Sequence, residues 1–102
     1  MIQYDKLIRD KIPEIIENSG KICEIEVLSE DEYLKYLNKK LLEEANEYEE
    51  SLDVEELADL EEVLRAILVA KGISYAEFET IRLKKVEGRG AFDKQLLLKS
   101  VK

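Results

Sequence analysis

Five carboxylates on two neighbouring helical segments are the residues of this sequence best suited to chemistry. They are Glu43, Glu44 and Glu47, followed after a short break by Glu56 and Asp59. Because helical side chains advance by about 100° per residue, Glu44 projects into the apolar stripe of its segment and Glu47 borders that stripe. Glu56 and Asp59 project into the apolar face of the next segment. Four acids are thus predicted to face inward, whereas Glu43 stands off the stripe; an acidic coiled coil that buries a few acids is the alternative.

Inward-facing carboxylates need partners, because burying an unpaired one costs several kcal/mol or raises its pKa. Lys39 and Lys40 precede the first acids, and Arg65 projects to the far side of its helix. The nearby cations are therefore not expected to neutralise the set. A hard divalent cation would satisfy several carboxylates at once, and ligation by oxygen alone suits Mg²⁺ or Mn²⁺.

The spacing of the acids suggests how such a site would be built. Glu44 and Glu47, like Glu56 and Asp59, are three residues apart, so each pair lies on adjacent turns of one helical face. Two antiparallel helices with these faces together would form a four-carboxylate site, as in helical-bundle metal proteins.

Composition limits the classes of protein to consider. At 102 residues the chain is predicted to be a single domain, 1–102, and the net charge of −8 argues against nucleic acid or an anionic membrane as partner. The absence of histidine excludes Ser-His-Asp catalysis and the usual zinc sites. A lone cysteine, no signal peptide and no apolar run of membrane-spanning length predict a cytoplasmic protein.

Local signals predict four helices and two short strands. Capping boxes at Ser29/Glu32 and Ser74/Glu77 open helices, and Pro13 suits the first turn of a short one. An extended lead-in over residues 1–10 precedes them, and the two strands would most simply pair as a small β ribbon. The predicted helices cover residues 12–18, 29–51, 53–71 and 74–87, and the predicted strands residues 21–28 and 95–101.

Three stretches together resemble a known family. Glu43-Glu44-x-x-Glu47 followed by Glu56-x-x-Asp59 resembles the signature of the MazG-like nucleotide pyrophosphohydrolases. The opening stretch 4–16 and the turn at 89–92 are similar to a small branch labelled as related to phosphoribosyl-ATP pyrophosphohydrolase. The resemblance spans nearly the whole chain, although the break between the acidic helices is shorter than in many relatives. It implies an all-α, antiparallel helical bundle of the MazG type that acts as a dimer.

The resemblance also implies roles for individual residues. Mg²⁺, or Mn²⁺, would be bound by Glu44, Glu47, Glu56 and Asp59, and Glu43 matches a residue that orients or deprotonates the attacking water. Basic side chains either hold the substrate phosphates or balance a very acidic protein. These candidates are Lys6, Arg9 and Lys11 near the start, and Arg82, Lys85 and Arg89 later in the chain.

The expected activity is Mg²⁺-dependent cleavage of a nucleoside triphosphate between its α and β phosphates, which suits house-cleaning of the nucleotide pool. Phosphoryl-type transfer needs charge neutralisation and a positioned water more than covalent chemistry. Two alternatives stay open: hydrolysis of phosphoribosyl-ATP, and a non-catalytic helical module for dimerisation or regulation.

Overall fold

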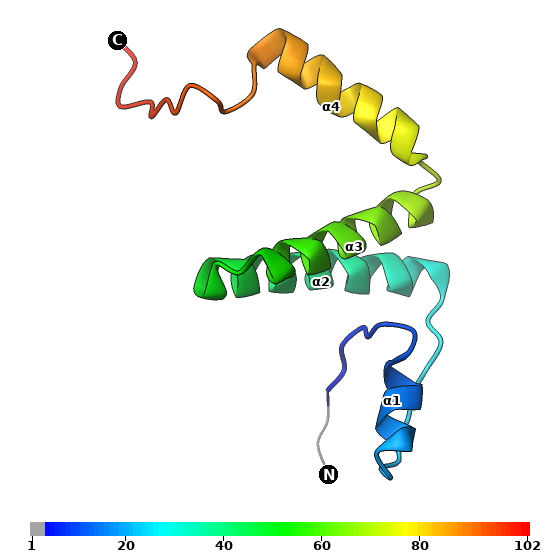
Figure 1. Cartoon of the computed structure of the whole chain (residues 1–102). Helices are drawn as coiled ribbons and strands as arrows, with labels where there is room; N and C mark the ends of the chain where they lie inside the picture. Colours follow the sequence, from blue (N-terminus) through cyan, green and yellow to red (C-terminus); the bar gives the residue numbers. More distant parts are fainter. Residues whose placement is uncertain (1–3) are drawn as a thin grey trace.

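The four helices form where the sequence signals predict them, although the last one continues past the predicted end at residue 87, through Gly88 to Arg89. The computed structural model describes residues 4–102, so the first three residues of the predicted lead-in lie outside the described part. The all-α prediction is confirmed, and no strand forms among residues 4–102 (Figure 1). The four helices are α1 (Ile12–Asn18), α2 (Glu30–Ser51), α3 (Val54–Ala70) and α4 (Tyr75–Arg89).

Side-chain caps fix two of the helix starts. The Ser29 Oγ accepts a hydrogen bond from the Glu32 N–H at 3.3 Å, and the Ser74 Oγ accepts one from the Glu77 N–H at 3.1 Å. Each cap satisfies a backbone donor that has no partner within its helix. Asp53 occupies the N-cap position of α3 but makes no capping hydrogen bond with its side chain.

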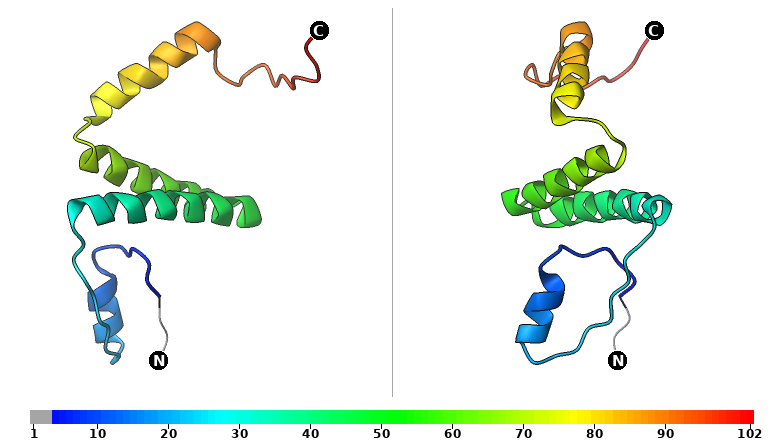
Figure 2. Two further views of the ribbon diagram at one scale, coloured as in Figure 1. Left: turned by 180° about the vertical axis from the view of Figure 1, so that it is seen from behind. Right: turned by 90° about the vertical axis from the view of Figure 1, so that its right-hand side faces the viewer.

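Helices α2 and α3 form an antiparallel hairpin joined by only Leu52 and Asp53 (Figures 1 and 2). Leu52 ends α2 in the left-handed region, with φ 60°, and its N–H donates to the Tyr48 carbonyl at 2.6 Å. So short a connection holds the inner faces of the two helices together along their length.

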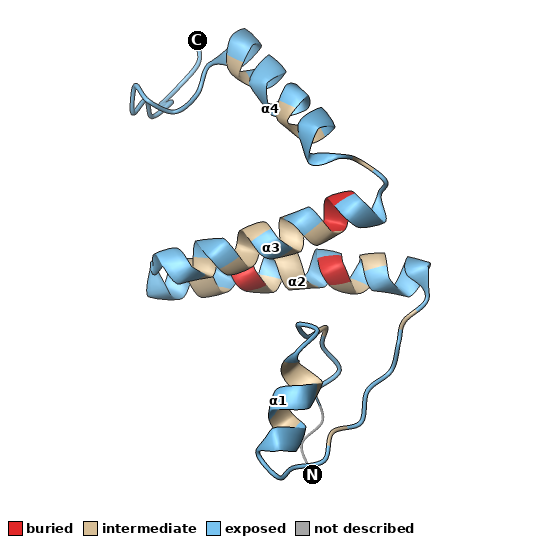
Figure 3. Cartoon of the chain, turned by 45° about the vertical axis from the view of Figure 1, so that its right-hand side comes forward, coloured by how far each residue is buried: buried red, intermediate tan, exposed pale blue. Residues whose placement is uncertain are grey.

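The core of this hairpin is small. Among the described residues, the buried apolar side chains are Leu37 on α2 and Ile67 and Leu68 on α3 (Figure 3). Helix α3 contacts α4, but α4 makes no comparable contact with α2 or α1. The hairpin is therefore the structural centre of the described chain.

The chain around the hairpin is open. Helix α1 and residues 4–11 lie on one side of the hairpin, and α4 with the C-terminal tail lies on the other (Figures 1 and 2). The radius of gyration is 18.0 Å, whereas a compact chain of this length has about 13 Å. None of the helices within residues 4–102 combines the length and the apolar character needed to cross a membrane.

The predicted β ribbon is not formed. Residues 21–28 and 95–101 have no strand structure, and the hairpin lies between them (Figure 1). The alternating and apolar patterns indicate a tendency toward extended backbone. A stable strand also needs a second strand beside it, and a local sequence pattern does not show whether one is present.

Candidate metal centre

Three carboxylates from the two hairpin helices meet at one point. Glu44 of α2 and Glu56 and Asp59 of α3 each offer one oxygen, and these oxygens all lie within 4.8 Å of one another. Glu56 and Asp59 are one helical turn apart, and the antiparallel packing brings Glu44 opposite them. The two helical faces predicted to carry these acids do face each other.

Glu44 is the buried member of this cluster. Its side chain is 8% exposed, and its Oε2 has no hydrogen-bond partner among the described residues. Burial raises the pKa of Glu44, and the charge of Glu47 raises it further. Buried carboxylate oxygens normally have a donor or a cation beside them, and the unpaired Oε2 has neither among the described residues.

Glu47 adjoins the cluster without being one of the three closest acids. Its charge raises the pKa of Glu56, where desolvation is the larger cause, as well as that of Glu44. Glu47 is therefore an electrostatic neighbour of both acids, and its role as a fourth ligand stays a prediction.

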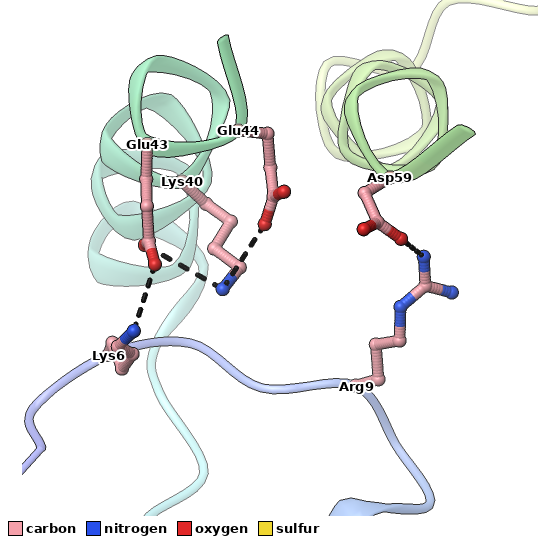
Figure 4. A network of polar contacts seen from close by, with 6 residues as sticks. All are labelled: Lys6, Arg9, Lys40, Glu43, Glu44 and Asp59. Carbon is pink, nitrogen blue, oxygen red and sulfur yellow. Dashed lines mark hydrogen bonds and ion pairs between the residues drawn. The ribbon is translucent and has the colours of Figure 1, made fainter. Parts of the chain in front are cut away.

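The N-terminal segment crosses the carboxylate face of the hairpin and brings two cations to it (Figure 4). The Lys6 Nζ lies 2.9 Å from Glu43 Oε1, and the Arg9 Nη2 lies 2.6 Å from Asp59 Oδ1. Lys6 and Arg9, which the sequence analysis predicts to bind substrate phosphates, pair here with carboxylates, and their phosphate-binding role stays a prediction.

Lys40 is a partner that the sequence prediction set aside. Its Nζ lies 3.5 Å from Glu44 Oε1 and 3.7 Å from Glu43 Oε2. The expectation that nearby cations leave the acids unneutralised was thus wrong in part. The signal was present, since Lys40 precedes these acids by three and four residues and so lies on their helical face.

Glu43 forms ion pairs with two of these cations. It lies between Lys6 and Lys40, and the hydrogen bond from Lys6 is the main cause that lowers the pKa of Glu43 (Figure 4). The predicted position off the apolar stripe therefore agrees with the structure, and Glu43 is not one of the three clustered acids.

The other predicted phosphate-binding residues lie elsewhere. Lys11 occupies the N-cap position of α1. Arg82, Lys85 and Arg89 are on α4, across the hairpin from the N-terminal segment, and Arg82 pairs with Glu79 (Figure 1). A single chain does not bring these three α4 cations to the carboxylates.

The raised pKa values of Glu44 and Glu56 predict a pH dependence of stability without metal. A carboxyl whose pKa is raised on folding stabilises the fold while it is protonated, and this stabilisation disappears as the pH rises through the raised pKa. Glu44→Gln removes one such group, so its stability relative to wild type should increase from acidic to neutral pH. Urea unfolding at several pH values in a metal chelator measures this difference. A difference that does not change with pH would contradict the burial of an ionisable Glu44.

The comparisons with known proteins give no characterized site with which this one can be compared. No protein-family profile matches the chain, and no solved structure matches it. A protein of Mycolicibacterium smegmatis described as uncharacterized is 50% identical over 42 residues, which are 41% of this chain and 43% of that protein. The match spans less than half of either protein, so the family resemblance stays a prediction.

Proposed function

We propose that this protein is a Mg²⁺-dependent nucleotide pyrophosphohydrolase of the MazG type, releasing a nucleoside monophosphate and pyrophosphate from a nucleoside triphosphate. The observation that supports this proposal best is the buried Glu44, which meets Glu56 and Asp59 in the cluster and has an unpaired Oε2. Lys40 compensates the Oε1 side of this carboxylate but leaves Oε2 unpaired, and burial of an incompletely paired carboxylate is unfavourable for a module that only packs.

The donor set fits the proposed cation. Glu44, Glu56 and Asp59 would hold it, with Glu47 as the adjacent fourth ligand, and all four offer the oxygen atoms that Mg²⁺ and Mn²⁺ prefer. When bound, the cation would neutralise negative charge on the carboxylates and on the substrate phosphates. This local reversal of charge would let a protein with a net charge of −8 accept a polyanion.

Lys6 and Arg9 would supply the first protein contacts to the phosphates. Both side chains are largely exposed at the edge of the cluster, and each is held there by a single carboxylate. Exposed ion pairs contribute at most about 1 kcal/mol, so a polyphosphate can displace the carboxylates from these cations.

Glu43 would then act on the attacking water. While Lys6 donates to it, the pKa of Glu43 is lowered and it is a weak base. Transfer of Lys6 to a phosphate removes the main cause of that lowering, so the basicity of Glu43 would increase as substrate binds.

Binding of Mg²⁺ should raise the melting temperature of the protein. A ligand at 100 times its Kd that binds only the folded state stabilises it by about 2.7 kcal/mol, and here it also relieves repulsion among the acids. Melting curves with and without Mg²⁺ or Mn²⁺ measure the effect, and Glu56→Gln should abolish it. The matched control Glu55→Gln, one residue earlier and exposed, should retain it. Melting that is indifferent to both cations would contradict the site.

Pyrophosphate release from a panel of nucleoside triphosphates, with and without Mg²⁺, tests the activity. The panel should include damaged nucleotides and phosphoribosyl-ATP, because the acidic site alone does not distinguish their bases and sugars. Release that needs Mg²⁺ would support the proposal, and the preferred compound would decide between its two substrate classes. Binding of Mg²⁺ without hydrolysis of any compound would favour the non-catalytic module.

A further inference from the structure

Two extended segments of this chain have unpaired backbone and exposed apolar side chains. Within the described residues, the backbone groups of residues 22–28 and 96–101 make no backbone hydrogen bond. Ile22 is 98% exposed and Leu97 81%, and Ile25, Val27, Leu96 and Leu98 are also exposed. Unpaired extended backbone with apolar side chains is a template for pairing with another strand.

The two segments cannot pair with each other within one chain in this fold. The α2–α3 hairpin lies between them, with residues 21–28 on the α1 side and residues 95–101 on the α4 side (Figures 1 and 2). A partner for each segment must therefore come from another molecule.

The exposed surface is large enough to need such a partner. The chain exposes 9589 Å², whereas a folded monomer of its mass exposes about 6,000 Å². The excess of more than 3,000 Å² compares with about 800 Å² buried per partner in a standard stable interface, and obligate dimers bury more. The area thus fits an obligate interface between copies of the chain.

Charge points to a second copy as that partner. Residues 80–102 carry seven Lys and Arg against two acids, a net charge of +5, whereas residues 1–79 carry nine against 22, a net charge of −13. The same polarity appears in the two segments, since Glu24 and Glu26 lie on the first, and Lys94 and Lys99 lie beside and on the second. Two antiparallel copies related by a two-fold axis would bring opposite charges together.

We propose that two copies of this chain form a closed dimer in which residues 96–101 of each chain pair as a β-strand with residues 22–28 of the other. A two-fold axis gives each chain one donated and one received strand, so both exposed segments are covered at once. The two-stranded ribbon expected from the sequence would then form between chains. This proposal does not depend on the proposed activity.

The lone Cys23 lies on the first segment and allows a direct test. Wild-type chains are mixed during refolding with chains that carry Cys23→Ala and one of Leu96→Cys, Leu97→Cys or Leu98→Cys, plus a tag that changes their size. Each chain in the mixture has one thiol, so a disulfide of mixed size, formed with diamide and seen on a non-reducing gel, joins the two segments of different chains.

Paired strands predict an alternating result. Since successive strand side chains point to opposite faces, the mixed disulfide should be several times stronger either at position 97 or at positions 96 and 98. Chains with Cys23→Ala and Glu50→Cys, an exposed position on α2, are the matched control and should give none. Sedimentation of the untreated wild type should give the mass of a dimer.

Three outcomes would overturn the proposal. One is that the wild type stays monomeric across the accessible concentration range. Binding of nucleic acid by such a monomer, through the basic residues 80–102, would identify a different partner. Another is a mixed disulfide equally strong at positions 96, 97 and 98 and at the Glu50 control, which indicates random collision. The last is a disulfide confined to single chains when one of the three leucine-to-cysteine changes is made without changing Cys23.

Discussion

Glu44→Gln is expected to reduce pyrophosphate release by about 10³-fold and to raise the melting temperature of the metal-free protein. Glu44 is the buried ligand of the proposed centre, and a metal ion contributes several kcal/mol of charge stabilisation in the transition state, at about 1.4 kcal/mol per tenfold in rate. The same change removes a buried, incompletely paired negative charge, so the fold without metal should gain stability. Opposite effects on activity and stability distinguish a ligand from a structural acid.

The measurements are pyrophosphate release in saturating Mg²⁺ and melting in a metal chelator. Glu50→Gln is the matched control, because Glu50 is an exposed glutamate on the same helix and its loss should change neither quantity appreciably. If Glu44→Gln unfolds the protein, or leaves hydrolysis near the wild-type rate, Glu44 is a packing residue and the proposed centre is wrong.

Glu43→Gln should lower turnover by on the order of 10²–10⁴-fold while the Kd for Mg²⁺ changes little. Glu43 lies beside the three clustered carboxylates but is bound to Lys6 and Lys40, so its proposed role is to take a proton from the attacking water. Glutamine preserves its size but cannot act as a base.

Turnover and Mg²⁺ affinity of this variant are measured together. The matched control is Glu79→Gln, which removes another exposed partner of an arginine or lysine, on α4 away from the carboxylates. Both changes should alter the free energy of unfolding by no more than about 1 kcal/mol. Near-normal turnover would make Glu43 an ordinary surface acid, and a collapse of Mg²⁺ affinity would make it a ligand.

Local sequence signals were sufficient for the helices and for the arrangement of the acids on them. The serine caps, Pro13 and the apolar periodicity act over a few residues, and the predicted bounds of the helices agree closely with the structure. The inward direction of Glu44, Glu56 and Asp59 followed from helical geometry and from a connection too short for anything but an antiparallel return.

Contacts between segments that are far apart in the sequence could not be predicted from these local signals. The pairs Lys6–Glu43 and Arg9–Asp59 join residues 37 and 50 positions apart, and no periodicity records such distances. The absence of the β ribbon has the same cause, because pairing depends on where the segments end up in space. The Lys40–Glu44 ion pair could have been predicted, since the four-residue spacing places both side chains on one helical face.

The two-residue connection between α2 and α3 also has a consequence for the order of folding. All five acids of the proposed centre lie within residues 43–59, so the hairpin can close through contacts that are local in sequence, and such contacts form quickly. Like charges meet during this closure, and a divalent cation present at that moment should speed folding as well as slow unfolding. Lys6 and Arg9 are far in sequence from the carboxylates that they bind, so these ion pairs should form after the hairpin. Removing either cation should therefore mainly speed unfolding. The metal would in that case act as a folding nucleus before the protein has a substrate to bind.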